Sequence, residues 1–386
     1  MRDKTVLPKK YFSKYKEPLV PFPKLLNTQL DSFKLLLEKG IQNVITEFNP
    51  ISDYSGKKLQ LEFSDIAITM PKYDEYYAKQ NKISYEAQIK ARVKLTNKAT
   101  GHAKEQEIFL SDIPVMTPHG TFVVNGVERV IVAQLARSPG VFFTQGEIRS
   151  KKYFGAKVIP SRGVWIEIEM DSDGSLNVKI DKKKKFPIVS LLRVLGVTEK
   201  EMIKEISETD YHKKAIEDMI AKDAAKTIED SYVQIYGRLR DGDLATADNA
   251  REFIDGLFSP ERYDFSAVGR FRFNSRFGLP TKGAEVERRT LSGSDLLLIV
   301  SHILTLQNTP GSKPDDIDHL ASRRVRYVGE MLEAKIRTGM MQMKRNIQDR
   351  MSTIDVSTAM PMNVLNQRPL QVKIKELLMA GMWCCC

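Results

Sequence analysis

Three groups of side chains in this sequence could do chemistry. Arg129, Gln134 and Arg137 stand at the end of TPHGTFVVNGVERVIVAQLARSPGVFF, residues 117–143. The stretch DDIDHLASRRVR, residues 315–326, places three carboxylates before three guanidinium groups. Trp165, one of two tryptophans, follows Arg162 and a glycine. Arginine forms planar, bidentate hydrogen bonds with carboxylates, phosphates and base edges, so these groups indicate recognition of anions or bases.

Ordinary structural explanations compete with that interpretation. In residues 315–326 acids come first and bases later, which suits a helix start and its dipole. This explains the order of the charges, but not why Arg323, Arg324 and Arg326 must point in several directions. A tryptophan is most often a core residue, whereas Trp165 at the surface would be a platform for stacking a base. Both alternatives stay open on the residues alone.

Signals for catalysis or cofactor binding are weak. The five histidines (102, 119, 212, 302 and 319) have no second His or Cys at ligand spacing, so we expect no zinc site. Asp171 to Gly174 indicates a turn, because the later glutamate of a calcium loop is absent. Lys182 to Lys185 is typical of a solvated turn, with phosphate contact as the alternative. We find no Walker loop and no Ser-His-Asp order, so we expect no cofactor, metal or catalytic residue in this chain.

Composition limits the class of protein. The 386 residues are 42% hydrophobic, with a formal net charge of +11 and a pI of about 9.3, which favours a polyanionic partner. The length suggests two domains, with three as the alternative. No 18-residue apolar run and no signal peptide are found, so we expect no membrane partner. The cysteines are Cys384, Cys385 and Cys386, which cannot form a disulfide framework and indicate a reducing compartment.

Periodicity predicts a mixture of strands and helices. We expect a helix over 25–39 ended by Gly40, and alternating strands over 58–109 that the hairpin at Asn125-Gly126 completes. After Gly140 a second antiparallel sheet is expected from 157–160, 164–170 and 176–180. Further helices are expected over 186–195, 198–206, 215–236, 246–257, 293–306 and 327–351, with a strand or loop over 270–274.

Five motifs occur in the order of a known family: the stretch 117–143, IPSRGVW, LRDGD followed by NARE, ERYDFSAVGR, and DDIDHLASRRVRYVGE. Together they span just over half of the chain, and the sequence resembles the N-terminal part of the β subunit of bacterial DNA-dependent RNA polymerase. The resemblance implies an α+β fold of two mixed domains. Residues 1–136 and 324–386 would form a protrusion-like domain, and residues 137–323 a lobe-like domain inserted into it.

The resemblance also implies where nucleic acid binds. In the family, a pocket of β contacts the nontemplate strand of melted DNA. The matching positions are Arg137, Trp165, Arg240, Ile317, Asp318 and Arg323. Trp165 would stack on an unpaired base, Asp318 would accept a hydrogen bond from a base amino group, and Arg323 would hold Asp318. Arg129, Val132 and Gln134 match the edge of the rifamycin pocket.

A larger assembly follows from the same resemblance. The partners would be DNA, the remaining β domains, the β′, α and ω subunits and a sigma factor, in the bacterial cytoplasm. The catalytic Mg2+ of this nucleotidyltransferase would be bound by β′, so this chain alone is expected to be inactive.

The final segment departs from the family. Leu377 to Cys386 reads LLMAGMWCCC and matches nothing in the loop that follows in β. A truncated or frameshifted reading frame is the favoured interpretation, and a split subunit is the alternative. A different class of function is a stand-alone interaction or decoy protein that binds polymerase partners without DNA. Phosphate-driven binding weakens steeply with salt and an apolar protein interface does not, which separates the two.

Overall fold

The structure of this protein is a computed structural model. It describes residues 23–98, 100–148, 150–207, 209–240, 242, 246–283, 287–355, 359–379 and 383–385. Cys386 and part of the LRDGD motif lie outside these ranges.

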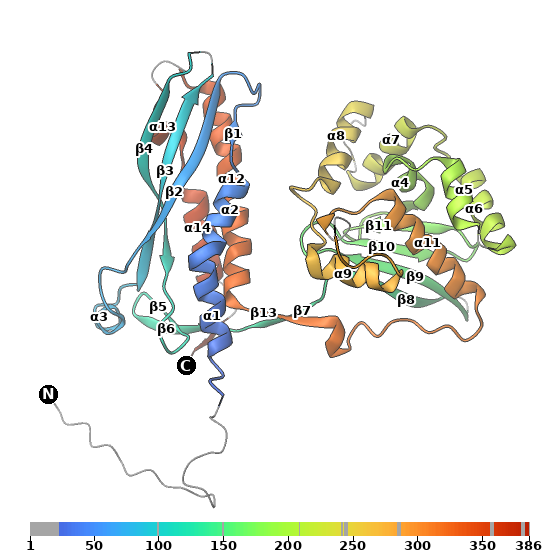
Figure 1. The fold of residues 1–386 in the computed structure, drawn as a ribbon, viewed down its shortest axis with the longest axis horizontal. Coiled ribbons are helices and arrows are strands. Elements are labelled where there is room, and N and C mark those ends of the chain that lie inside the picture. Colours follow the sequence, from blue (N-terminus) through green and yellow to red (C-terminus); the bar gives the residue numbers. More distant parts are fainter. Residues whose placement is uncertain are drawn as a thin grey trace, which may run out of the picture. The chain divides into compact units, whose positions relative to one another are not determined.

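The chain forms two compact units, drawn in Figure 1. Unit 1 combines the chain up to Gln134 with the chain from Val325 onward, and unit 2 is Leu135–Arg324. Each unit has its own hydrophobic core and packs helices on antiparallel sheets. The predicted α+β class is therefore confirmed.

A four-stranded antiparallel sheet is the centre of unit 1. Its order is β1 (Ile51–Ser52), β2 (Leu59–Thr69), β3 (Glu86–Asn97) and β4 (Ala103–Pro114). Alternate residues of β2 and β3 are buried, as the twofold period of a strand requires when one face is covered. The alternation read from residues 58–109 is thus confirmed as strands.

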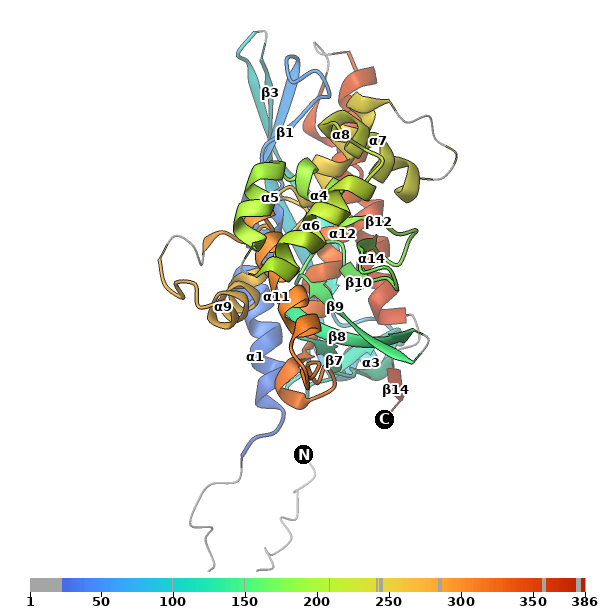
Figure 2. The ribbon, with the colours of Figure 1, turned by 90° about the vertical axis from the view of Figure 1, so that its right-hand side faces the viewer.

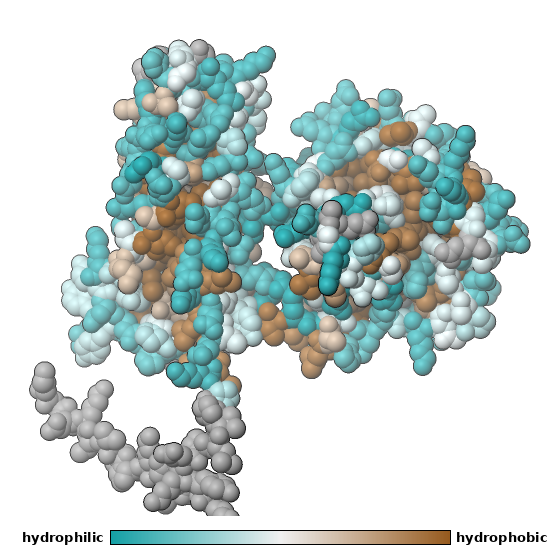
Figure 3. Space-filling model, viewed as in Figure 1, coloured by the Kyte–Doolittle hydropathy of each residue, from teal (hydrophilic) through white to brown (hydrophobic). Residues whose placement is uncertain are grey.

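Helices cover the buried face of the β1–β4 sheet in unit 1. They are α1 (Asn27–Leu35), a π-helical turn (Leu36–Gly40), α2 (Ile41–Glu47), α12 (Val328–Thr353), α13 (Pro361–Val364) and α14 (Arg368–Met379). Figure 1 shows α1, α2, α12 and α14 side by side. The prediction that Gly40 ends the first helix was wrong, because its φ of −61° is helical and the chain continues into α2. In Figure 3 hydrophobic residues are visible in the middle of this unit, between hydrophilic ends.

The predicted hairpin is present but belongs to another sheet. Asn125 and Gly126 have φ values of 52° and 78°, as a two-residue hairpin turn requires, and they join β5 (Phe122–Val124) to β6 (Val127–Ile131). β6 also pairs with β14 (Trp383–Cys385), which gives a separate three-stranded sheet. The hairpin therefore does not complete the β1–β4 sheet, a correction to the sequence interpretation. The short helix α3 (Glu75–Gln80) contacts β5.

Unit 2 is built on a five-stranded antiparallel sheet. Its order is β12 (Phe186–Pro187), β11 (Leu176–Ile180), β10 (Ile166–Met170), β9 (Lys151–Ile159) and β8 (Gly140–Ile148). Around it lie α4 (Ile188–Val194), α5 (Glu199–Ile206), α6 (Asp210–Lys222), α7 (Ile228–Leu239), α8 (Ala247–Phe258), α9 (Ser266–Arg276) and α11 (Gly293–Asn308). Figure 2 turns α5 and α6 toward the viewer. The segments β7 (Gln134–Arg137) and β13 (Arg323–Arg326), where the chain passes between the units, pair with each other.

Two secondary-structure predictions in unit 2 were wrong. Residues 215–236 form parts of two helices, α6 and α7, because the chain breaks at Asp223, whose ψ of 127° is extended. Residues 270–274 lie within α9 rather than in a strand or loop. Arg270 in α9 is 1% exposed and forms two hydrogen bonds, of 2.9 and 3.0 Å, with the buried carboxylate of Asp295.

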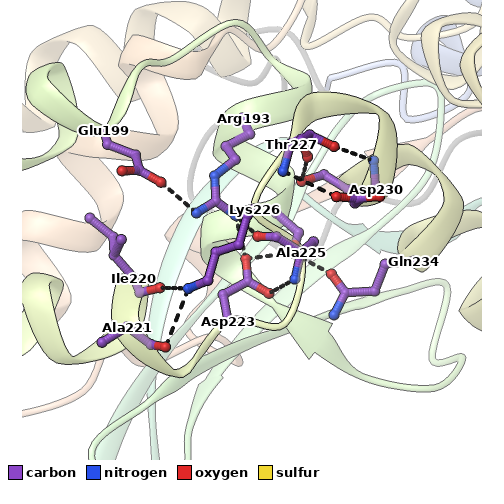
Figure 4. A network of polar contacts seen from close by, with 12 residues as sticks. Arg193, Glu199, Ile220, Ala221, Asp223, Ala225, Lys226, Thr227, Asp230 and Gln234 are labelled. Carbon is purple, nitrogen blue, oxygen red and sulfur yellow. Dashed lines mark hydrogen bonds and ion pairs between the residues drawn. The ribbon is translucent and has the colours of Figure 1, made fainter.

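A second buried ion pair fixes the break between α6 and α7, and Figure 4 shows it. The side chain of Arg193 in α4 is 5% exposed, and its Nη1 lies 2.6 Å from Oδ2 of the fully buried Asp223. Nη1 also donates to the carbonyl of Ala225, and Nη2 reaches Glu199 at 2.7 Å. A buried charge needs such partners, so this arginine ties α4 to the loop that separates two helices.

Candidate nucleic-acid interface

Arg137 and Trp165 lie together in unit 2. The Arg137 guanidinium carbon is 6.0 Å from the centroid of the Trp165 ring, the distance of a cation–π contact. The backbone N–H of Trp165 donates to Oδ1 of Asp181 at 3.0 Å, and the Asp181 N–H donates to the Trp165 carbonyl at 3.0 Å. Both Arg137 and Trp165 are half-buried. The backbone of Trp165 is thus fixed just before β10, and the residue is partly exposed.

Asp315 anchors the acidic segment to the sheet. Its Oδ2 accepts the Phe143 N–H at 2.7 Å, and its own N–H donates to the Phe143 carbonyl at 2.9 Å. Arg276 of α9 forms hydrogen bonds of 2.8 and 2.9 Å with the two Asp315 oxygens and lies 4.7 Å from the Phe143 ring centroid. The helix start considered for residues 315–326 is therefore wrong. The segment is irregular up to a 3-10 turn (Leu320–Ser322), and β13 follows.

The next residues form a tight turn. Oδ1 of Asp316 accepts the N–H groups of Asp318 and His319 at 3.0 and 3.1 Å, and Nδ1 of His319 accepts the Ala321 N–H at 3.1 Å. The side chain of Ile317 is half-buried and that of Asp318 is exposed. Asp318 therefore has a carboxylate in solvent on a backbone that its neighbours hold in place.

The chain segments of Arg137 and Arg323 are adjacent. The Ser138 N–H donates to the Ser322 carbonyl at 3.0 Å, next to the β7–β13 pairing. Arg323 is half-buried, and its Nε is buried without a hydrogen-bond partner among the residues that the structure describes. The fold thus gathers Arg137, Trp165 and Arg323, and Ile317 and Asp318 precede Arg323 in the same segment.

Arg240, the sixth predicted DNA contact, lies at another element. It follows the end of α7, its guanidinium carbon is 5.0 Å from the centroid of the Phe253 ring of α8, and it is exposed. The three residues of the predicted rifamycin edge lie in unit 1. Arg129 on β6 donates from Nη1 to the Leu378 carbonyl at 3.3 Å, Val132 is exposed, and Gln134 begins β7.

A cavity of about 450 Å³ in unit 2 adjoins the acidic segment. Its lining residues come from β8, α9 and residues 315–322, and they include Arg272, Arg276, Asp316, His319 and Ser322. The Arg272 guanidinium carbon lies 5.6 Å from the Phe142 ring centroid. The sequence analysis missed Arg272 and Arg276, the two arginines of α9 that line this cavity. Their spacing of four places them on one face only once the segment is known to be a helix.

Within the described ranges, no group of three or more His, Cys, Asp or Glu side chains is arranged to hold a metal ion. The arrangement offers cations, an aromatic ring and an exposed carboxylate, which can bind bases and phosphates.

Comparison with known proteins relates this chain to a protein family. Residues 137–326 match the family described as RNA polymerase Rpb2, domain 2. The DNA-directed RNA polymerase subunit beta of Syntrophomonas wolfei is 40% identical over 367 residues, which cover 95% of this chain and 32% of that protein. The chain is homologous to the N-terminal region of the RNA polymerase β subunit. The corresponding subunit of Gloeobacter violaceus is 37% identical over 357 residues, covering 92% of this chain and 31% of that protein. This β-subunit homologue spans about a third of the length of these relatives. None of its described helices is both long and apolar enough to cross a bilayer.

Proposed function

We propose that this β-subunit homologue acts in DNA-templated transcription, as one wall of the DNA cleft whose unit 2 binds the nontemplate strand of melted DNA. The observation that carries the proposal is the Arg137–Trp165 contact, at 6.0 Å, on a chain segment adjacent to that of Arg323. An aromatic ring, guanidinium groups and an exposed acceptor are the groups with which single-stranded nucleic acid is bound.

Each side chain has a distinct role in this proposal. The exposed part of Trp165 stacks on an unpaired base, a contact worth about 1–3 kcal/mol. Asp318 accepts a hydrogen bond from a base amino group, and Ile317 packs beside that base. Arg137 and Arg323 neutralise phosphates and orient Trp165 and Asp318, and Arg240 contacts the strand farther along.

Trp165 fluorescence provides a direct test on the full chain. Replacing Trp383 by phenylalanine leaves Trp165 as the single tryptophan. A single-stranded decanucleotide should quench its emission, and log K should fall linearly with log salt at a slope of about −0.7 per neutralised phosphate. Arg137→Ala should weaken binding, whereas Arg238→Ala, an exposed arginine of α7, should not.

The same titration can also contradict the proposal. Unchanged emission with the oligonucleotide, or equal losses for Arg137→Ala and Arg238→Ala, would remove Trp165 and Arg137 from the interface. A partner bound by an apolar surface would show little salt dependence, which is the behaviour of a stand-alone interaction protein.

The proposal also assigns each compact unit to a domain of the polymerase β subunit. Unit 2 would be the lobe-like domain and unit 1 the protrusion-like domain. The compact units divide at 134/135 and 324/325, which supports an insertion with boundaries close to 136/137 and 323/324. In this role the chain works with the remaining β domains, β′, α, ω and a sigma factor in the bacterial cytoplasm. The Mg2+ of nucleotide transfer is then bound by β′.

The rifamycin edge is a separate part of the proposal. Arg129 and Gln134 present polar groups near the exposed Val132, at the end of β6 and the start of β7. In an assembled polymerase, Gln134→Leu should raise the rifamycin concentration needed for inhibition and leave transcription without drug unchanged. Equal sensitivity of the variant and the parent enzyme would remove Gln134 from this pocket.

A further inference from the structure

Unit 1 contains a cavity whose lining includes none of these residues. Its volume is about 670 Å³, in the range of small-ligand sites, and it opens where the chain leaves β2 toward α3. The lining side chains that matter here are Met70, Tyr73, Lys82, Glu86, Asp112 and Lys375. Figure 1 shows α3 beyond the end of the β2–β4 sheet, near β5 and β6.

One wall of the cavity is aromatic and exposed. Tyr73 and Tyr77 stack with ring centroids 4.7 Å apart and an interplanar angle of 19°. Tyr73 is 51% exposed and Met70 is 87% exposed, so neither belongs to the core. A flat, exposed and prestacked ring at a cavity is the arrangement on which an unpaired base stacks.

The lining also carries two carboxylates, which are hydrogen-bond acceptors. Glu86 on β3 pairs in register with Pro114, and Gln88 pairs with Asp112 on β4, so Glu86 and Asp112 are diagonal neighbours on one sheet face. Burial raises the pKa of both carboxyls, and the charge of Asp112 raises the pKa of Glu86 further. Lys375 lines the same cavity, and its positive charge lowers the pKa of both carboxyls, opposing the effect of burial.

We propose that this cavity binds one nucleotide of single-stranded nucleic acid whose base carries an exocyclic amino group. The base stacks on Tyr73, its amino group donates to Glu86 and Asp112, and Lys82 and Lys375 hold the flanking phosphates. A cationic peptide suits the site less well, because those two lysines would repel it. The site is independent of the Arg137–Trp165 interface, which lies in unit 2.

Cytosine and thymine provide a matched pair of ligands. Both are pyrimidines and stack alike, but cytosine presents an N4 amino donor where thymine presents the O4 acceptor. The carboxylates should therefore favour (dC)5 over (dT)5 by roughly tenfold, the discrimination that a good base-edge contact provides. Met70 serves as the reporter, because it lines this cavity and its methyl group gives an NMR signal in 13C-methionine protein.

Three variants of the full chain test the roles of the stacking ring and of the carboxylate. Tyr73→Ala should weaken the (dC)5 titration seen at Met70 by at least about fivefold, whereas Tyr76→Ala should leave it unchanged. Tyr76 is a 65% exposed tyrosine of α3 that does not line the cavity. Glu86→Gln should reduce the preference for cytosine while (dT)5 binding stays within about twofold, since the stacking ring remains.

The titration is run in a Trp165→Ala background, so failure of the unit 2 proposal and failure of this one are distinguishable. A Met70 signal that no oligonucleotide moves would overturn the assignment, as would equal losses for Tyr73→Ala and Tyr76→Ala. A tetra-arginine peptide that moves Met70 at lower concentration than (dC)5 would also overturn it, in favour of a basic protein partner.

Discussion

Replacing Arg193 by methionine should destabilise unit 2 strongly, because it leaves the carboxylate of Asp223 buried without its cation. The Asp223 side chain is 0% exposed, and the guanidinium at 2.6 Å is its charged partner (Figure 4). Among the residues that the structure describes, two neutral donors to Asp223 would remain, the Ser190 hydroxyl at 3.0 Å and the Ala225 N–H at 3.2 Å. Breaking a buried pair in this way costs about 3–5 kcal/mol. The contact with Glu199 adds little, because that side chain is 48% exposed.

Urea unfolding followed by Trp165 fluorescence, with Trp383 replaced by phenylalanine, measures this loss within unit 2. For a unit of this size the expected loss corresponds to a fall in Tm of roughly 6–20 °C. Lys222→Met is the matched control, because Lys222 and Asp173 form an ion pair at 3.1 Å whose side chains are both 52% exposed. That exposed pair should contribute less than about 1 kcal/mol.

The double variant Arg193→Met with Asp223→Leu separates the charge from the packing. Removing both charges should recover about 2 kcal/mol or more of the single-variant loss, since no unpaired carboxylate remains. If Arg193→Met costs less than about 1 kcal/mol, or if the two single losses simply add, then the stability of this loop does not depend on the buried pair.

Three further outcomes follow from the described contacts. Gly329→Ala should cost about 1–3 kcal/mol in thermal unfolding, because a Cβ there would lie 2.2 Å from the Ser32 carbonyl oxygen. Thr198→Ala should cost about 1 kcal/mol in urea unfolding, since Thr198 and Glu201 form the capping box of α5. Burial and Asp112 raise the pKa of Glu86, so the folded state binds that proton more tightly than the unfolded chain. Stability should therefore fall as pH rises above the ordinary glutamate pKa, and Glu86→Gln should flatten that slope in urea unfolding from pH 4 to 7.

The features predicted correctly are those that residues close together in the sequence determine. Asn125-Gly126 gave the hairpin because few other residue pairs adopt two consecutive positive φ values. Thr198 and Glu201 gave the start of α5 because both partners of a capping box lie within one turn. Neither feature depends on distant residues. The sheet to which the hairpin belongs was not predictable in the same way, because β6 pairs with β14 from the far end of the chain.

Ion pairs between segments distant in the sequence account for two wrong predictions. In Phe271-Arg272-Phe273 apolar and charged residues alternate as in a strand, yet the segment is helical. Arg270 beside it is held by Asp295 and lies 5.4 and 5.2 Å from two phenylalanine ring centroids, so tertiary contacts override the alternation. The charge order after Asp315 likewise suited a helix start. The carboxylate of Asp315 instead pairs with Arg276, which lies 39 residues away in the sequence.

The chain segments of Arg137 and Arg323 are adjacent for a topological reason. They are 186 residues apart in the sequence, and no periodic pattern links them. When one compact unit is inserted into another, however, the chain enters and leaves the insert at neighbouring points of the host. The hydrogen bond from Ser138 to Ser322 and the pairing of β7 with β13 are the local form of that constraint. An insertion therefore brings its first and last residues together whatever lies between them, so the chain segments of Arg137 and Arg323 are adjacent without any signal in the intervening sequence.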